Sequence, residues 1–239
     1  MLPAATQGIE DQLDAAYELI LHSKFEAARA ILVPLDRRKP ESGRAAFMLG
    51  LSYHQQHRYG VALPHFRRAV ELEPDYRQTQ HFLGYCLYYL GDGAGARKAF
   101  ETFLEHSPDS PHTHFALGLV AYDDDRLEEA RSCFVRAIEL CGATPGLRQR
   151  RASAHARLAD VDIRTGRLEA ARRQLERAIR LNPALYGAYF KLSRVLTSLG
   201  EHEAARRAYE RFLHVRDGVR AAKAATATST ATATSTAGR

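Results

Sequence analysis

The chain has 239 residues, of which 45% are hydrophobic and 26% are charged, and its formal net charge is +6. This apolar content excludes a wholly disordered chain. The longest strongly apolar run, residues 82–90, is about half as long as a membrane-spanning helix, so no membrane span is expected. The N-terminal residues show no basic region followed by an apolar one. We therefore expect no signal peptide and a cytoplasmic protein.

The basic residues are concentrated in the C-terminal part of the chain. Residues 1–145 contain 15 Lys+Arg and 20 Asp+Glu, whereas residues 146–239 contain 19 and 8. Such an asymmetry is one sign of an anionic partner. However, 29 of the 34 basic residues are arginine, and codon bias in a GC-rich genome would produce the same excess. Charge alone therefore does not indicate a nucleic-acid-binding protein.

The three cysteines, Cys86, Cys133 and Cys141, are an odd number and form no CxxC pair. This pattern favours reduced structural thiols over a disulfide framework or a zinc site.

Alanine recurs every 34 residues, at positions 28, 62, 96 and 130, and again at 171 and 205. A fixed period of this length indicates an array of stacked repeats. The gap between Ala130 and Ala171 exceeds the period by seven residues. With each alanine taken as position 20, the repeats are 9–42, 43–76, 77–110, 111–144, 152–185 and 186–219, with an insert at 145–151.

Residue types at other positions of the repeat predict two helices in each unit. Position 8 is small in every repeat, and we expect it to face the alanine at position 20 so that two helices approach closely. Proline at position 32 in four repeats ends the second helix. Glycine at position 15 in three repeats opens the turn between the helices. The sequence therefore predicts an all-α fold of antiparallel helix pairs.

This pattern resembles the tetratricopeptide repeat (TPR) family, and the resemblance covers residues 9–219. Repeat 43–76 matches best, with Leu49, Gly50, Tyr53, Ala62, Phe66, Ala69 and Pro74 in the family's places. The resemblance implies a right-handed α-solenoid of about six stacked helix–turn–helix units. Two departures are the absence of tryptophan at position 4 and the presence of Asp162 at position 11, where the family has an apolar residue. We expect an arginine or a water molecule to satisfy Asp162.

In this family the first helices build a concave groove, which implies a protein-interaction scaffold that binds a partner's peptide or helix. Aromatic and histidine side chains dominate the corresponding positions, and they suit peptide recognition. The alternative for each is packing between neighbouring repeats. An apolar ligand segment with an acidic flank would suit this set. The implied groove residues are Tyr17, Phe47, Leu51, His54, His81, Tyr85, Tyr88, Tyr89, His112, Phe115, Leu119, Tyr122, Arg164 and Arg194.

An RNA- or anion-binding solenoid that uses the basic C-terminal half is the alternative function. It has few aromatic residues among its arginines, so no platform on which bases could stack is evident. Glutamates lie three or four residues from several of these arginines, which favours a solvated face with ion pairs. The arginines on this face are Arg172, Arg173, Arg177, Arg180, Arg206, Arg207 and Arg211.

Residues 91–96 match GxGxxA, a phosphate-binding fingerprint that requires a preceding strand. A predicted helix precedes them here, so we interpret the glycines as a turn between helices. The histidine pairs have no obvious third metal ligand, and no group of residues has a recognisable catalytic setting. We therefore expect no metal, no cofactor and no enzymatic activity.

The insert 145–151 adds almost two helical turns, which favours a helix from about 145 to 165 with Thr144 as its cap; a surface loop is the alternative. Residues 1–8 are expected to be disordered. Residues 220–239 form a low-complexity Ala/Thr/Ser tail, which we expect to be disordered from about 224. Such a tail would leave the last repeat uncovered, and self-association through that repeat is then expected.

Overall fold

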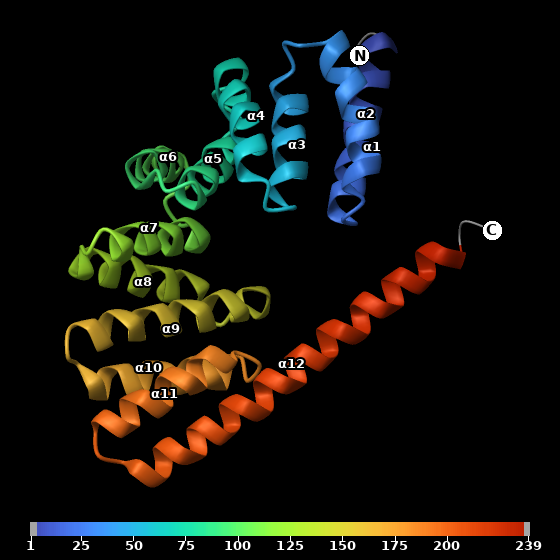
Figure 1. Ribbon diagram of the computed structural model, residues 1–239. Coiled ribbons are helices and arrows are strands. Elements are labelled where there is room, and N and C mark those ends of the chain that lie inside the picture. The colour runs from blue at the N-terminus through green and yellow to red at the C-terminus, as the bar shows by residue number, and fades with distance from the viewer. Residues whose placement is uncertain (1–3, 237–239) are drawn as a thin grey trace. The chain divides into compact units, whose positions relative to one another are not determined.

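The computed structural model describes residues 4–236, and all regular elements in this range are helical, which confirms the all-α class (Figure 1). The helices follow one another in pairs joined by short turns. A 3₁₀ turn, η1 (Pro145–Leu147), precedes the ninth helix. The α-helices are α1 (Ala4–Leu21), α2 (Phe25–Arg38), α3 (Gly43–His54), α4 (Tyr59–Leu72), α5 (Gln78–Tyr89), α6 (Gly93–His106), α7 (Pro111–Asp123), α8 (Leu127–Cys141), α9 (Arg148–Arg164), α10 (Leu168–Leu181), α11 (Tyr186–Ser198) and α12 (His202–Thr236).

Two compact units divide the chain: an N-terminal unit of residues 1–120 and a C-terminal unit of residues 121–239, with the boundary inside α7. In the N-terminal unit each helix packs against its pair partner, and α3 also contacts α1 and α5. In the C-terminal unit each helix contacts the next one along the chain, from α8 through α9, α10 and α11 to α12.

The alanines that define the period are the centre of each helix pair. Those at positions 28, 62, 96, 130 and 171 are completely buried, and Ala205 is only 6% exposed. Since alanine has a single methyl group, the helix backbones can approach closely at this point. The 34-residue period therefore marks the position at which the two helices of each repeat pack together.

The small residue at position 8 has a different neighbour from the expected one. A Cβ atom added to Gly50 would lie 2.8 Å from the ring of Phe66, and one added to Gly84 would lie 2.5 Å from the ring of Phe100. Both phenylalanines are at position 24 and are completely buried. Position 8 is thus small because the position-24 ring occupies its side-chain space, and not only because it approaches the alanine at position 20.

The turn inside each repeat places position 15 in the left-handed backbone region. Three of these residues are glycines, with φ of 85° at Gly91, 71° at Gly166 and 81° at Gly200. Ser23, His57 and Asp125 adopt the same conformation at φ 57°, 59° and 61°. The turn geometry therefore requires this conformation, and glycine is the residue that adopts it without a Cβ penalty.

The structure confirms that the GxGxxA segment is a turn between helices. Helix α5 precedes it, and Gly91 makes the left-handed turn. Asp92 caps α6 by accepting a hydrogen bond from the backbone N–H of Gly95 at 2.8 Å. No strand precedes the glycines, so this segment lacks the context of a dinucleotide-binding fold.

The insert is helical, as the sequence favours. Residues 145–147 form the 3₁₀ turn η1, and α9 continues from Arg148 to Arg164. Thr144 occupies the N-cap position and Pro145 the start of the turn, but the threonine side chain makes no capping hydrogen bond. The insert therefore makes α9 17 residues long, whereas α3 and α5 each have 12.

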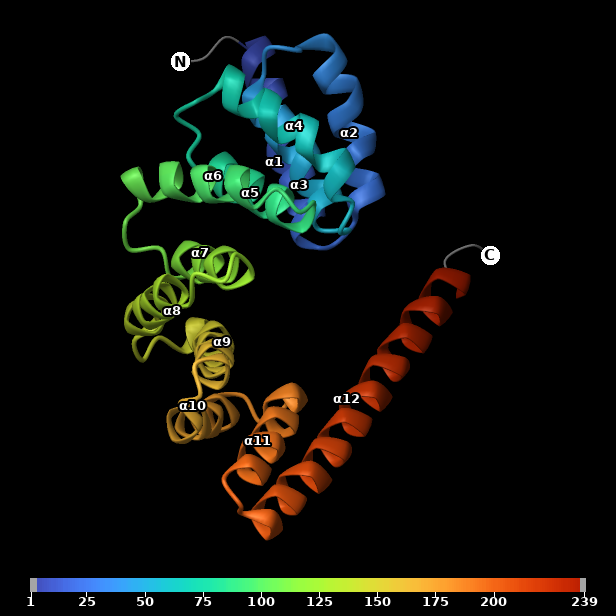
Figure 2. The same ribbon diagram turned by 60° about the vertical axis from the view of Figure 1, so that its left-hand side comes forward.

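Both ends of the chain differ from the expected disorder. Helix α1 begins at Ala4, and α12 continues along the tail to Thr236, well past the end of its partner α11 (Figure 2). Alanine has the highest helix propensity, and residues 219–236 contain no glycine or proline to stop propagation from the packed part of α12. Residues 1–3 and 237–239 lie outside the described range.

Asp162 is fully buried in the C-terminal unit, and one of its two carboxylate oxygens is paired with arginine, one of the two expected partners. Arg131 donates a hydrogen bond to Asp162 Oδ1, and Arg167 Nε lies 3.5 Å from the same oxygen. Asp162 Oδ2 has no hydrogen-bond partner among the described residues. A buried charge of this kind is tolerated only while its cationic partner remains.

We predict that Gly84→Ala lowers the free energy of unfolding by about 1–3 kcal/mol, because the new methyl group overlaps the buried ring of Phe100. Gly60→Ala in α4 is the matched control, because a Cβ there meets nothing within 4 Å. The control should gain about 0.5–1 kcal/mol from helix propensity. Urea denaturation measures both values, and equal effects of the two substitutions would refute the proposed contact.

We predict that Arg131→Met lowers the free energy of unfolding by about 3 kcal/mol, because it leaves the buried Asp162 carboxylate poorly compensated. Adding Asp162→Leu should restore most of that loss. Leucine stands at the same repeat position in three other repeats, at Leu19, Leu87 and Leu196. A double-mutant cycle measures the coupling, and simple additivity of the two substitutions would contradict this assignment.

Candidate protein-binding groove

The first helices of the N-terminal unit carry a continuous set of aromatic contacts. On α3, His54 lies against Phe82 with ring centroids 5.3 Å apart, and against Tyr85 at 6.4 Å. On α5, Tyr85 contacts His81 at 5.0 Å and Tyr89 at 6.3 Å. Ring contacts therefore connect α3 and α5 through His54, Phe82 and Tyr85.

The next contact joins α5 to the start of α7. The Nδ1 atom of His81 lies 2.9 Å from the hydroxyl of Thr113, and the hydroxyl of Tyr85 donates a hydrogen bond to the carbonyl oxygen of His112 at 3.4 Å. His81, Tyr85 and His112 are all partly buried. The structure therefore brings these three predicted residues together and holds the side chains of His81 and Tyr85 by contacts with α7.

Tyr89 is the most exposed aromatic residue of this set, with 52% of its surface accessible. Its ring stacks on Tyr59 with centroids 4.4 Å apart and contacts Tyr88 at 5.3 Å. Tyr59 begins the second helix of its repeat, whereas the family resemblance places only first-helix residues in the groove. Its ring could have been anticipated from its place immediately after the turn.

Four predicted residues are buried and present little surface to a ligand. Phe47 is 1% exposed, Leu51 is 5%, Phe115 is 7% and Leu119 is 8%. Phe47 packs against Phe66 and Phe82 with centroids 5.8 and 5.7 Å apart. Phe47 therefore has the alternative role, packing between neighbouring repeats. The burial of Leu51 favours the same role for that residue. Tyr17 on α1, in contrast, is 38% exposed.

In the C-terminal unit Arg164 and Tyr122 come together. The guanidinium carbon of Arg164 lies 4.7 Å from the centroid of the Tyr122 ring, and Nη1 donates a hydrogen bond to the Tyr122 carbonyl at 3.1 Å. Arg164 also forms an ion pair with Asp125 in the turn after α7. Arg164 is thus held in place, and its charge is partly neutralised by Asp125.

Arg194 is exposed on α11 and lines a small pocket of about 120 Å³. The other lining residues are Ile163, Leu168, Lys191, Val195 and Ser198. Lys191 forms an ion pair with Asp160 at 2.6 Å, whereas no carboxylate pairs with Arg194 among the described residues. This pocket combines an apolar floor with a cationic rim.

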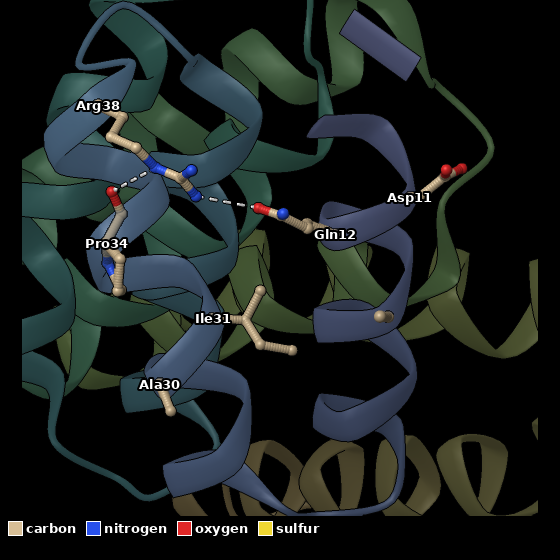
Figure 3. Close-up of a pocket in the computed structure, with 7 residues that line it drawn as sticks. Asp11, Gln12, Ala30, Ile31, Pro34 and Arg38 are labelled. Carbon is tan, nitrogen blue, oxygen red and sulfur yellow. Dashed lines mark hydrogen bonds between the residues drawn. The ribbon is translucent and has the colours of Figure 1, made fainter. Parts of the chain in front are cut away.

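A larger pocket of about 400 Å³ lies between α1 and α2 (Figure 3). Ala15 is at position 7 here, where all five other repeats have leucines that are buried or partly buried. A hydrogen bond of 3.2 Å from Arg38 to Gln12 crosses the space between the helices, as Figure 3 shows. The pocket is thus accounted for by small side chains on the open face of the first repeat, and we assign it no ligand.

Burial lowers the pKa of His54 to about 4, with a smaller contribution from His57. Neither ring nitrogen of His54 has a hydrogen-bond partner among the described residues. The ring of His54 contacts Tyr59, Phe66, Phe82 and Tyr85. His54 is therefore a neutral member of an aromatic cluster at physiological pH.

The described residues contain no group of three or more His, Cys, Asp or Glu side chains that could hold a metal ion. Within the same range, no helix is both long and apolar enough to cross a membrane. The three cysteines form no disulfide, and burial raises the pKa of the Cys86 thiol to about 12.

Sequence and structure comparisons agree on one family. Tetratricopeptide repeat models match residues 43–76, 83–110, 109–184 and 156–225. A stretch of 77 residues is 36% identical to bacteriophage adsorption protein A of Escherichia coli K12. That match spans 32% of this chain but only 8% of the longer protein.

Solved structures with a similar fold include Pseudomonas aeruginosa pilF, with a TM-score of 0.75 at 14% identity over 90% of this chain and 95% of that one. PilW, described as a widely conserved type IV pilus biogenesis factor, has a TM-score of 0.73 at 17% identity over 84% and 90%. YrrB, described as a TPR protein with an unusual peptide-binding site, has 0.59 at 15% identity over 78% and 92%. At these identities the likeness shows the fold, a solenoid of paired helices.

We predict that the free energy of unfolding falls by up to about 1.4 kcal/mol per pH unit, as a contribution of His54, between pH 6.5 and about 4. In this window the unfolded chain binds a proton at His54 and the folded chain does not, so stability is lost as the pH falls. His54→Phe should remove this contribution while keeping the aromatic packing. Urea denaturation at several pH values measures the difference between the two proteins, and parallel pH profiles would contradict the prediction.

Proposed function

Because this chain belongs to the tetratricopeptide repeat family, we propose that it is a non-catalytic scaffold that binds a peptide or helix of a partner protein along its first helices. The family consists largely of interaction scaffolds, and one structural neighbour, YrrB, is described as having a peptide-binding site. The described surface adds support, because it offers aromatic contacts on the helices where such a ligand would lie. A cytoplasmic location remains a prediction of the sequence.

The observation that carries this proposal is the tyrosine surface formed by Tyr59, Tyr85, Tyr88 and Tyr89. Tyr89 is half exposed, yet its ring is stacked on Tyr59. Tyr85 behind it is fixed by its hydrogen bond to the His112 carbonyl. Rings that are held in place before binding lose little conformational entropy on binding, and tyrosine provides both apolar area and a polar hydroxyl.

The chemistry of this surface favours a ligand with an apolar segment. In the C-terminal unit, Arg164 and Arg194 would favour acidic residues in any ligand segment that reaches them. Arg194 is the better candidate, because Arg164 already pairs with Asp125. The partner's identity follows from neither feature.

Nucleic-acid binding by the basic C-terminal half is the second candidate function. Several of its arginines are already paired with glutamates: Arg172 with Glu176 and Glu201, Arg206 with Glu210, and Arg207 with Glu203. Such pairs reduce the charge available to phosphates. Oligonucleotide binding that weakens steeply with salt would nevertheless favour this function over the peptide scaffold.

Self-association through the last repeat is a further part of the proposal. Tyr186, Phe190 and Tyr209 are 43%, 39% and 45% exposed, and each lies within 6.2 Å of the Phe212 ring, centroid to centroid. Helix α12 continues straight past the end of α11 and does not fold back over it (Figures 1 and 2). An exposed aromatic cluster of this kind is a plausible contact between two copies of the chain.

We predict that Tyr89→Ala weakens partner capture by about 2 kcal/mol, roughly 30-fold, because it removes an exposed aromatic anchor. Affinity purification from the native cell with quantitative mass spectrometry measures the captured protein. Leu72→Ala on α4 is the control, since it removes an exposed apolar side chain that belongs neither to the candidate groove nor to the self-association cluster. Both variants should keep the helical circular dichroism signal. Unchanged capture by a folded Tyr89→Ala protein would exclude this surface as the binding site.

A further inference from the structure

A second pocket in the C-terminal unit combines three arginines with a histidine. It has a volume of about 360 Å³ and lies among α8, α9 and α10. Its lining residues are Ile138, Arg151, His155, Arg177, Arg180 and Leu181. This place differs from the candidate groove, because Arg177 and Arg180 belong to a second helix and Arg151 belongs to the insert.

The arginines of this pocket have no carboxylate partner. No ion pair joins Arg151, Arg177 or Arg180 to an acidic side chain among the described residues. The nearest glutamates along these helices are used elsewhere, since Glu139 pairs with Arg136 and Glu176 with Arg172. The expectation of a face with paired charges therefore fails at Arg177 and Arg180. Arg177 and Arg180 are exposed, so water and salt screen part of the repulsion among these three charges, and a bound anion would reduce it further.

Backbone contacts hold Arg151, which lines the pocket, and Arg148, which lies one turn before it on α9. Arg151 donates a hydrogen bond from Nη1 to the carbonyl of Gly142 at 2.7 Å, and Arg148 donates from Nη2 to the carbonyl of Arg180 at 3.4 Å. The Nε atom of Arg151 is buried and has no hydrogen-bond partner among the described residues. A buried donor without an acceptor is costly, so Arg151 carries an unmet hydrogen bond beside its contact with Gly142.

His155 forms the wall of the pocket and is 4% exposed. Its Nδ1 atom lies 2.7 Å from Gln174 Oε1, which fixes the orientation of the ring. Burial lowers the pKa of His155, and Arg177, Arg151 and Arg180 lower it further, while the contact with Gln174 raises it. The positive charges of the three guanidinium groups therefore add to one another beside the His155 ring.

The insert places positively charged side chains at the end of a helix that favours negative charge. Arg148, Arg150 and Arg151 occupy the first turn of α9, which contains no acidic residue. The N-terminal end of a helix carries a partial positive charge, so cations there destabilise the helix and anions stabilise it. A local conflict of this kind in an otherwise regular array is typical of a functional site.

From these observations we infer that the pocket binds a phosphate monoester, either as a small molecule or as a phosphorylated side chain of a protein. Planar guanidinium groups match the oxygen geometry of a phosphoryl group and can bind it in a bidentate manner. Ile138 and Leu181 provide apolar contact for the carbon atoms next to the ester oxygen. The inference does not depend on the tyrosine surface, because the two sites share no residue.

The test is a titration of the full chain with inorganic phosphate at low ionic strength, followed by the NMR signals of the His155 ring. We expect a saturable shift that acetate at the same concentration does not reproduce. Arg177→Gln combined with Arg180→Gln should weaken phosphate binding about tenfold or more. The matched control is Arg206→Gln with Arg207→Gln, which removes the same charge from the exposed face of α12. The control should stay within about twofold of the unaltered protein.

Phosphoserine peptides distinguish the two sources of the phosphate. Tighter binding of a phosphoserine peptide than of inorganic phosphate, lost in the double variant, supports the inference and assigns a phosphorylated protein. If the double glutamine variant unfolds, Arg177→Lys with Arg180→Lys keeps the charge but loses the bidentate geometry, and it should still weaken binding. Equal binding of acetate, equal loss in the control, or no saturable shift would each overturn the inference. Stronger binding of a single-stranded oligonucleotide, lost in the double variant, would overturn it in favour of nucleic acid.

Discussion

The contact of a small position-8 residue with the position-24 side chain of the same repeat is the constraint on which the rest of this structure depends. At Gly50 and Gly84 there is no room for even one added carbon, because Phe66 and Phe100 fill the space. The buried alanine at position 20 permits the same close approach from the second helix. Since both helices of a repeat are fixed in this way, their remaining faces are presented at a regular spacing.

That regular spacing explains why the aromatic core and the candidate groove are continuous in the N-terminal unit. Phe66 stacks on Phe82 of the next repeat with centroids 6.0 Å apart, and Phe82 contacts His54. His54 in turn lies against Tyr85 and Tyr59, whose neighbour Tyr89 reaches the surface. A ligand at the surface would therefore meet rings that the core already supports, which favours a rigid binding surface over an adaptable one.

The C-terminal unit uses arginine in three physically different ways. Arg131 compensates a buried carboxylate, Asp162, and Arg172 joins an exposed network with two glutamates. Arg177 and Arg180 have neither role, and the insert brings Arg151 to the same pocket. Net charge does not distinguish these cases, because the distinction depends on which acidic side chain each guanidinium can reach.

Sequence periodicity by itself determined the helix pairs, the buried alanines, the turn at Gly91 and the need of Asp162 for a polar partner. These follow from local rules, because helix period, turn conformation and the cost of a buried charge act over a few residues or at a fixed repeat spacing. Only the tertiary structure decided that Phe47 is buried while Tyr89 is exposed, that Tyr59 joins the tyrosine surface, and that Arg151, Arg177 and Arg180 surround one pocket. These depend on how neighbouring helices pack, and on a seven-residue insert whose effect on α9 the repeat pattern could not determine.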